Sequence, residues 1–224
     1  MFGYFGSKRD LGHCYPTPRH DLVIEAFAGS ASYALHGDNW RRDVLLVERN
    51  ESLAMLWRWL INDARPADIV ALPDLQVGQP LSQLPTVMRA VLAHVATVGN
   101  EATEDMVVSW SESRAGMADN VEKVKHWKVN CASYDDAPSA EATWFIDPPY
   151  QGPVGSGYLY GSSTIDFAHL AEWSRSRHGQ VIACESGCAT YLPFVPVRPL
   201  TDRPGDPHAE FVWHSNRRAG HSFE

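Results

Sequence analysis

Residues 143–150, TWFIDPPY, join a β-favouring apolar segment to an acid, two prolines and an aromatic residue. The three residues before the acid have no helical period, so they predict a buried strand that ends at Asp147. Pro148 and Pro149 lack a backbone N–H and favour extended conformations, so the chain must leave the sheet there. We therefore expect Asp147 and Tyr150 to lie at the carboxyl end of a strand, where open α/β sheets bind ligands.

An Asp-Pro step by itself is also an ordinary turn signal, so a strand that merely ends here is the alternative interpretation. The complete acid-Pro-Pro-aromatic run is much more specific, and a functional interpretation of it requires a cofactor site elsewhere in the chain. Residues 24–35, IEAFAGSASYAL, supply a candidate. A glycine directly after a strand lets the backbone approach a ligand closely, and the start of a following helix favours negative charge.

The glycine pattern and a second acid indicate which ligand such a site would hold. Gly29 stands in a single Phe-x-Gly turn, whereas the common dinucleotide fingerprint needs more glycines, so a NAD site is not indicated. Glu48 ends the next apolar segment about 20 residues further on, where nucleotide sites place the acid that holds ribose hydroxyls. Together these features predict an adenosine-bearing ligand without a pyrophosphate.

Composition limits the class of protein. A chain of 224 residues with 44% hydrophobic residues is long enough for one well-buried domain with a small insertion. No segment is long and apolar enough to span a bilayer, and the start of the chain, MFGYFGSKRD, lacks a secretory signal, so we expect a cytoplasmic protein. Four scattered cysteines match neither a disulfide framework nor a complete metal-ligand spacing, so we expect reduced thiols and no metal.

The net charge of −8 argues against a general polyanion binder, because most non-specific affinity for DNA comes from Lys and Arg that neutralise phosphates. Local basic clusters still offer phosphate contacts: Lys8 with Arg9, Arg41 with Arg42, Lys123 with Lys125 and Lys128, and Arg217 with Arg218. An ordinary solvated surface is the alternative for each cluster.

Alternating strand and helix patterns predict an α/β fold with a mostly parallel sheet and helices on both faces. The expected strands are residues 22–28, 44–48, 128–134, 143–147 and 180–185, and the expected helices are residues 31–37, 53–61 and 166–177. Asn50 is expected to cap the second of these helices, and Pro66 is expected to close it. Residues 194–200 and 209–215 are expected to pair as an antiparallel edge.

A separate segment lies between the second and third expected strands. Residues 66–127 begin with a connection rich in Pro, Gly and Gln, and their pattern turns helical from residue 86 onward. We therefore expect a catalytic domain formed by residues 1–65 and 128–224, with residues 66–127 as a small helical insert.

In the order of its motifs the chain resembles the Dam-type, class-alpha DNA adenine amino-methyltransferases, which use S-adenosylmethionine. The resemblance is carried by FGSK at 5–8, EAFAGS at 25–30, Glu48 and DPPY at 147–150, and it spans nearly the whole chain. DPPY after an apolar strand is the most specific of these features, and the Phe-x-Gly turn is less specific. The resemblance implies a Rossmann-like methyltransferase fold and production of S-adenosylhomocysteine.

The resemblance also implies the residues of the site. Asp147, Pro148, Pro149 and Tyr150 would form the catalytic motif. The cofactor would be bound by residues of several motifs: Phe5, Gly6, Lys8, Glu25, Phe27, Ala28, Gly29, Glu48, Arg49, Tyr134, Asp135 and Asp147. Residues 66–127 match the position of target recognition in the family. The partner would be double-stranded DNA with a flipped target base, contacted by Lys8, Arg9, Lys123, Lys125, Lys128, Tyr158 and Tyr160.

The residue types suit this chemistry. Methyl transfer from a sulfonium to an exocyclic amine is an in-line displacement, and the adenine amine is a poor nucleophile because its lone pair is delocalised into the ring. Asp147 can accept one amine N–H and the carbonyl of Pro148 the other, which localises the lone pair. Tyr150 would stack on the base, which must leave the duplex at a cost of about a few kcal/mol.

We therefore expect methyl transfer to N6 of adenine in DNA. Two alternatives stay open: the same motif can serve a cytosine amino group or a base in RNA, and the chain can be a catalytically silent DNA-binding or regulatory module. The intact DPPY argues against silence, whereas the negative charge argues mildly for it. The loop at 151–163 could close over a flipped base with Tyr158 and Tyr160 as platforms, and ordinary loop packing is an equal alternative for these tyrosines.

Overall fold

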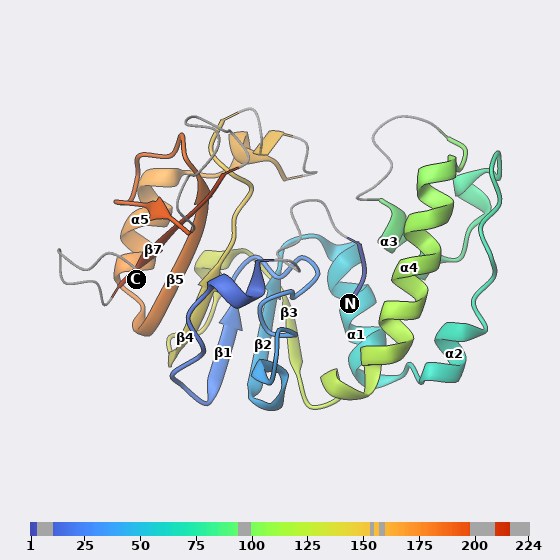
Figure 1. Cartoon of the computed structure of the whole chain (residues 1–224), viewed down its shortest axis with the longest axis horizontal. Coiled ribbons are helices and arrows are strands. Elements are labelled where there is room, and N and C mark those ends of the chain that lie inside the picture. Colours follow the sequence, from blue (N-terminus) through green and yellow to red (C-terminus); the bar gives the residue numbers. More distant parts are fainter. Residues whose placement is uncertain (4–10, 94–99, 153–154, 157–159, 198–208, 216–224) are drawn as a thin grey trace.

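The computed structural model describes residues 1–3, 11–93, 100–152, 155–156, 160–197 and 209–215. Within these residues the strands form one sheet in the order β3-β2-β1-β4-β5-β7-β6 (Figure 1). Its strands are β1 (Leu22–Glu25), β2 (Asp43–Glu48), β3 (Lys128–Cys131), β4 (Glu141–Ile146), β5 (His178–Ser186), β6 (Val195–Pro196) and β7 (Glu210–His214). Strands β1 to β5 are parallel, and β7 runs antiparallel to β5 and β6. The predicted fold class, a mostly parallel Rossmann-like sheet with an antiparallel C-terminal edge, is confirmed, and it is consistent with a methyltransferase fold.

Side chains of the central strands alternate between the two faces of the sheet, because successive residues of a strand point in opposite directions. On β4, Phe145 packs with Tyr15 and Tyr33 on one face, whereas Trp144 and Ile146 pack on the other face beneath helix α5 (Phe167–Arg175). The rings of Tyr33 and Phe145 are stacked with their centroids 4.4 Å apart. Both faces are buried, which explains why the strands read as continuous apolar runs.

Helix α1 (Glu51–Asn62) follows β2 and begins after Asn50, as predicted. The side-chain oxygen of Asn50 accepts hydrogen bonds from the backbone N–H groups of Ser52 and Leu53 at 3.0 and 3.4 Å. The apolar face of α1 is buried in the core. No helix in the described part of the chain combines the length and apolar composition that crossing a bilayer requires.

Two expectations about helices are wrong. Pro66 does not close the helix after β2, because α1 already ends at Asn62 and Pro66 is the first residue of α2 (Pro66–Val70). A proline suits that position, since the first helical N–H has no partner within the helix. Residues 31–37 form turns instead of the predicted helix. Gly29 and Ala31 have φ values of 49° and 52°, and these left-handed conformations are incompatible with a regular α-helix.

The insert, residues 66–127, shares the hydrophobic core of the elements around it. It contains α2, α3 (Thr86–Leu92) and α4 (Glu104–Asn120). Trp110 and Met117 of α4 belong to the same buried cluster as Trp57 of α1. Phe2 is also fully buried there, with its ring centroid 5.5 Å from that of Trp57. The insert is therefore packed onto the rest of the chain through a continuous apolar interface.

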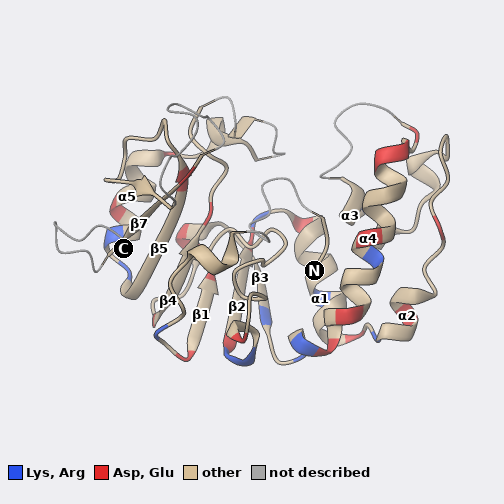
Figure 2. Cartoon of the chain, viewed as in Figure 1, with Lys and Arg blue, Asp and Glu red and all other residues tan. Residues whose placement is uncertain are grey.

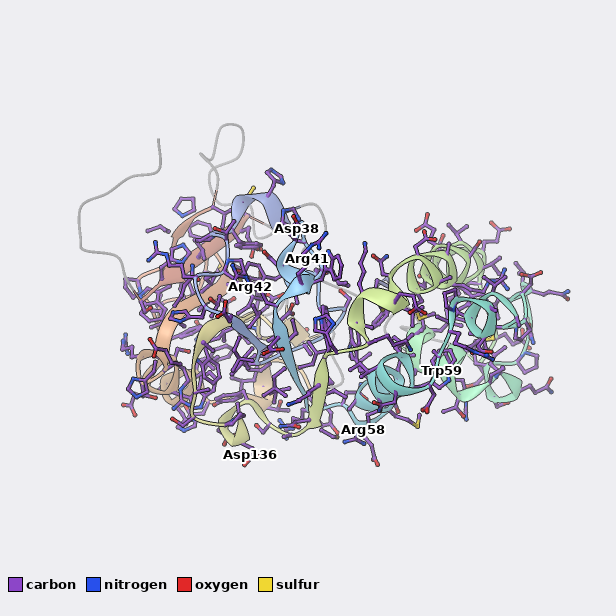
Figure 3. All side chains as sticks on the ribbon, turned by 90° about the horizontal axis from the view of Figure 1, so that it is seen from below. Asp38, Arg41, Arg42, Arg58, Trp59 and Asp136 are labelled. Atoms are coloured by element: carbon purple, nitrogen blue, oxygen red, sulfur yellow. The ribbon has the colours of Figure 1, made fainter. Side chains whose placement is uncertain are left out.

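Basic residues gather near the amino-terminal ends of the parallel strands, at the opposite end of the sheet from the DPPY motif (Figure 2). Below, the amino-terminal and carboxyl-terminal edges of the sheet mean the two ends at which these strands begin and end. Lys123 and Lys125 directly precede β3 and Lys128 begins it, so all three lie at the amino-terminal edge of the sheet. Asp147 follows the last residue of β4 and therefore lies at the carboxyl-terminal edge. Figure 3 views the molecule from below and labels Arg41, whose Nε is 3.0 Å from the Asp38 carboxylate. These three lysines, which were predicted to contact DNA, are thus not brought to the DPPY motif.

Lys125 stabilises a helix end. Its ammonium group donates hydrogen bonds to the carbonyl oxygen of Leu60, at 2.8 Å, and to that of Ala64. These carbonyls belong to the last turn of α1 and the residues after it, where backbone acceptors lack helical partners and a cation is favoured. This contact gives Lys125 a role in the fold that does not involve DNA.

Replacement of Lys125 tests this role. We expect Lys125→Met to lower the free energy of unfolding by about 1–2 kcal/mol, because two carbonyls lose a charged donor. Lys128→Met is the control, since Lys128 is exposed, and it should change the stability by less than about 0.5 kcal/mol. Urea denaturation measures both values, and equal small losses in the two variants would contradict the capping role.

Candidate active site

Buried glutamates stand at the carboxyl ends of the first two strands. Glu25, the last residue of β1, is 2% exposed, and its Oε1 accepts a hydrogen bond from the backbone N–H of Ala34 at 2.7 Å. Glu48, the last residue of β2, accepts from the N–H of Gly29 at 3.0 Å and from that of Asn50 at 2.8 Å. Glu48 therefore holds the Phe-x-Gly turn after β1 and the start of α1 at the same time.

Glu185 has the corresponding role on the other side of the sheet. It lies near the end of β5 and is completely buried. Its two carboxylate oxygens lie 3.0 and 3.1 Å from the backbone nitrogen of Gln151, the residue that follows the DPPY motif. The hydroxyl of Tyr191 donates to the same carboxylate at 3.1 Å. A strand-end carboxylate thus also fixes the loop after β4.

Burial changes the protonation of these carboxylates. Burial, with a smaller contribution from the charge of Asp147 and against the hydrogen bond from the Ala34 N–H, raises the pKa of Glu25 to about 8. Burial raises the pKa of Glu185 to about 7 and also raises the pKa of Glu48, although the backbone N–H groups oppose the rise in both cases. Glu25 is therefore mainly protonated at neutral pH, and a positive charge placed beside it would favour its ionised form.

The DPPY motif lies where the sequence predicts it. β4 ends at Ile146, and Asp147 follows as a half-buried residue. Pro148 is buried and Pro149 is half-buried. The chain then folds back on itself, because a Cβ atom added to Gly155 would lie 1.9 Å from the carbonyl oxygen of Tyr150. The backbone of the motif is therefore fixed from two sides, by Glu185 and by this close approach.

Tyr150 is also held at the end of its side chain. Its hydroxyl donates to Oε2 of Glu210 at 2.6 Å, and the hydroxyl of Tyr15 donates to Oε1 of the same residue at 2.6 Å. Burial, followed by the charges of Asp147 and Glu210, raises the pKa of Tyr150 well above its ordinary value, so the hydroxyl remains a donor. Neither Glu210 nor Tyr15 was predicted from the sequence as a site residue, and the two lie 195 positions apart. No spacing in the sequence could have connected them.

A carboxylate pair and a thiol lie close together beside the motif. One ligand atom from each of Asp147, Cys184 and Glu210 lies within 4.8 Å of the others. Such a set has the ligand types of a metal site, and both oxygens of Glu210 accept tyrosine hydroxyls. These residues form the immediate surroundings of Asp147.

Residues predicted to bind the cofactor meet at the same edge. The rings of Phe27 and Tyr134 are stacked with their centroids 5.2 Å apart and an angle of 26° between their planes. Tyr134 also shares a hydrogen bond of 2.7 Å with Nδ1 of His169. Ala28 is buried, and its N–H donates to the carbonyl of Val47 on β2 at 3.1 Å. The turn after β1 and the segment after β3 therefore form one apolar surface beside Glu48.

One contact joins a residue predicted to bind the cofactor to a residue predicted to bind DNA. The guanidinium carbon of Arg49 lies 4.5 Å from the ring centre of Tyr160. A hydrogen bond from Ser133 is the main cause that lowers the pKa of exposed Asp135, and the charge of Arg49 is a smaller one. The loop after the DPPY motif thus reaches the cofactor side of the sheet. Five predicted residues lie outside the described part of the chain: Phe5, Gly6, Lys8, Arg9 and Tyr158.

Comparisons with known proteins add little to this geometry. The chain matches no protein-family model, and no curated protein is significantly similar to it in sequence. It is similar in structure to a conserved hypothetical protein from Streptococcus pyogenes, with 12% identity, coverage of 92% of this chain and 91% of that one, and a TM-score of 0.37. A second similar structure is a proposed methyltransferase, YhhF, from Escherichia coli, with 11% identity, coverage of 86% and 74%, and a TM-score of 0.36. At such low scores, neither likeness carries weight for the function of this chain.

The raised pKa of Glu25 predicts a dependence of stability on pH. The folded protein keeps the Glu25 proton up to about pH 8, whereas the unfolded chain loses it near the ordinary value of 4.5. The folded state therefore binds more protons between these values, so the free energy of unfolding should fall as the pH rises through this window. Glu25→Gln carries no such proton and should show a flatter profile in denaturation experiments.

Glu185→Gln provides a matched comparison, because Glu185 shifts in the same direction but only to about 7. Below about pH 7, the free energy of unfolding of Glu185→Gln should fall less steeply with pH than that of the wild type. Above that pH, the two should fall with the same slope. A Glu25→Gln profile parallel to that of the wild type would show that Glu25 is ionised in the folded protein.

Proposed function

We propose that the protein transfers a methyl group from S-adenosylmethionine to the N6 amino group of adenine in DNA. The proposal rests on one observation above all, the position of the run Asp147–Tyr150 at the carboxyl end of β4. β4 lies directly beside β1, whose end carries Glu25 and the Phe-x-Gly turn. A cofactor held by that turn and a base held by the DPPY run would therefore meet at the same edge, where open α/β sheets bind ligands.

The charges of the site fit this cofactor. S-adenosylmethionine carries a sulfonium and an ammonium group, and when bound it supplies an electrophilic methyl group. Glu25 and Glu185 have pKa values raised by burial, so a cation placed near them would favour their ionised forms. A neutral or anionic cofactor would not favour ionisation of these two carboxyl groups. A cationic ligand would thus be stabilised by the carboxylates that it helps to ionise.

The shape of the cofactor side also fits an adenosine group. The stacked rings of Phe27 and Tyr134 offer an apolar surface for a purine. Glu48 stands beside them at the end of β2 and accepts backbone N–H groups from Gly29, Asn50 and Arg49. A carboxylate has about four acceptor positions, so Glu48 can hold these N–H groups and still accept a ribose hydroxyl.

The protein's own contribution to the reaction would be orientation of the amine. Asp147 would accept one N–H of the target amine and the carbonyl of Pro148 would accept the other, which directs the nitrogen lone pair away from the ring. The two prolines and the hydrogen bonds between Glu185 and Gln151 keep these acceptors in place. Tyr150 would stack on the base.

The charge distribution constrains how DNA would approach. The insert, residues 66–127, contains eight acidic and four basic residues, a net charge of −4, so it does not supply the basic surface that phosphates require. In the described part of the chain, acids also outnumber bases around the carboxyl-terminal ends of the strands (Figure 2), and the guanidinium of Arg49 contacts the ring of Tyr160. The base would therefore have to enter the site while the phosphates remain away from this edge, which agrees with base flipping.

Analysis of methylated nucleosides tests the proposal. Duplex DNA incubated with the protein and S-adenosylmethionine should contain N6-methyladenine when its nucleosides are separated by mass spectrometry. Methylcytosine in the DNA would instead indicate a cytosine amino group as the substrate, and methylated bases found only in RNA would indicate an RNA substrate. S-adenosylmethionine binding without transfer to any nucleic acid would favour a silent module.

Asp147→Asn tests the catalytic motif. We expect this variant to lower the transfer rate about a hundredfold or more, because the amide is a weaker acceptor and can place a donor against the amine. Calorimetry should show that its affinity for S-adenosylmethionine is retained. Asp43→Asn removes an exposed acid from the opposite edge of the sheet and should transfer at the wild-type rate. Near-normal transfer by a folded Asp147→Asn protein would defeat the catalytic role.

A further inference from the structure

Glu210 connects two tyrosines that are distant in the sequence. It begins β7 and pairs with Ser186 of β5. Each of its carboxylate oxygens accepts one hydroxyl, from Tyr15 and from Tyr150, and both distances are 2.6 Å. This is the length typical of hydrogen bonds from a hydroxyl to a charged carboxylate, which are stronger than neutral ones.

Tyr15 provides a rigid support for this carboxylate. It is 6% exposed, and its ring makes an edge contact with Phe145, with the centroids 5.2 Å apart. Phe145 lies in β4, two positions before Asp147. Glu210 is therefore fixed relative to the strand that carries the catalytic acid, and not only relative to its own strand.

The backbone of Tyr150 is held by a neighbouring position of the same strand pair. Glu185, which binds the N–H of Gln151, is adjacent to Ser186, the partner of Glu210 across β5 and β7. Tyr150 is thus tied to these strands at both ends, at the backbone through Glu185 and at the hydroxyl through Glu210. Few rotations of the ring remain, so it is ordered before any substrate binds.

We propose that Glu210 is a positioning residue that fixes the ring of Tyr150, through its hydroxyl, in the orientation in which it stacks on the target base. This inference rests on the proposed function. Stacking itself needs only the ring, and phenylalanine or tryptophan can also supply it. The hydroxyl and its charged partner therefore serve orientation, and their benefit is a base that binds to a surface already in place.

A double-mutant cycle tests the contact between the Tyr150 hydroxyl and the Glu210 carboxylate, which we call the clamp. Tyr150→Phe keeps the ring and removes the hydroxyl, and Glu210→Gln removes the charge with little change in shape. Each should lower kcat/KM for DNA by about tenfold, as expected for the loss of one hydrogen bond to a charged group. The kcat/KM of the double variant should be no lower than that of the less active single variant, because both changes remove the same hydrogen bond. The loss should fall on the KM for DNA, while the affinity for S-adenosylmethionine stays unchanged.

Two further tyrosine variants separate positioning from stability. Tyr33→Phe is the matched control, since the Tyr33 hydroxyl donates to the carbonyl of Pro16 at 2.7 Å and its ring packs on the same Phe145. It should lower the melting temperature and leave kcat/KM for DNA intact. Tyr15→Phe removes the second donor to Glu210 and should cause a smaller loss of kcat/KM than Tyr150→Phe.

The outcomes separate the clamp from the proposed function. An active wild type together with a fully active Tyr150→Phe variant overturns the clamp alone, and so do two single losses that multiply in the double variant. A wild type that binds S-adenosylmethionine but methylates no nucleic acid defeats the proposed function, and the base-holding role falls with it. Non-additive losses confined to the KM for DNA support both.

Discussion

The site depends on carboxylates that are buried at the ends of strands and accept backbone N–H groups from loops. Glu25 holds the turn after its own strand, Glu48 of β2 holds the turn after β1, and Glu185 of β5 holds the loop after β4. A buried carboxylate is costly unless it is hydrogen-bonded, so each one fixes the loop that satisfies it. In the sheet β1 and β4 are neighbours, flanked by β2 and β5. The two central loops, which carry the Phe-x-Gly turn and the DPPY run, are thereby positioned from the outside by the strands that border them.

The sequence was sufficient for the sheet because its strands are buried on both faces and therefore appear as apolar runs with polar ends. The positions of Asp147 and Glu48 follow from the same pattern, since an acid after a parallel strand must lie at the carboxyl edge. The turn at 31–37 was missed because its small apolar residues have good helical spacing, whereas the left-handed φ of Ala31 depends on the surrounding contacts. Glu185 ends an expected strand, as Glu48 does, and could have been found by that rule. The role of Glu210 required the fold, because Tyr15 and Tyr150 converge on it from distant parts of the chain.

The distribution of charge separates two parts of the proposed DNA binding, the contacts to phosphates and the binding of the target base. Lys123, Lys125 and Lys128, which were predicted to contact DNA, lie near the amino-terminal ends of the parallel strands, and Lys125 is engaged by the end of α1. Among the described residues, acids gather near the carboxyl-terminal ends of these strands, which would suit the proposed sulfonium cofactor and oppose phosphates. A duplex that entered this edge as a whole would meet like charge, whereas a single extruded base presents a neutral ring and an amine that donates hydrogen bonds. The acidic character of the site is thus compatible with a nucleic-acid base as substrate only if base and backbone are separated.

The same charge explains why the tyrosines around the motif have their hydroxyls on carboxylates. Asp147, Cys184 and Glu210 lie within one small volume, and an uncompensated cluster of this kind would repel and rearrange. Each hydroxyl from Tyr15 and Tyr150 supplies a donor without adding a charge, so Glu210 is satisfied while the field at Asp147 remains negative. A lysine or arginine in their place would satisfy Glu210 more strongly, but it would also attract Asp147 and compete with the amine that this acid is proposed to hold. Neutral donors on a fixed carboxylate therefore keep the motif rigid and add no positive charge that would compete for Asp147 with the proposed substrate amine.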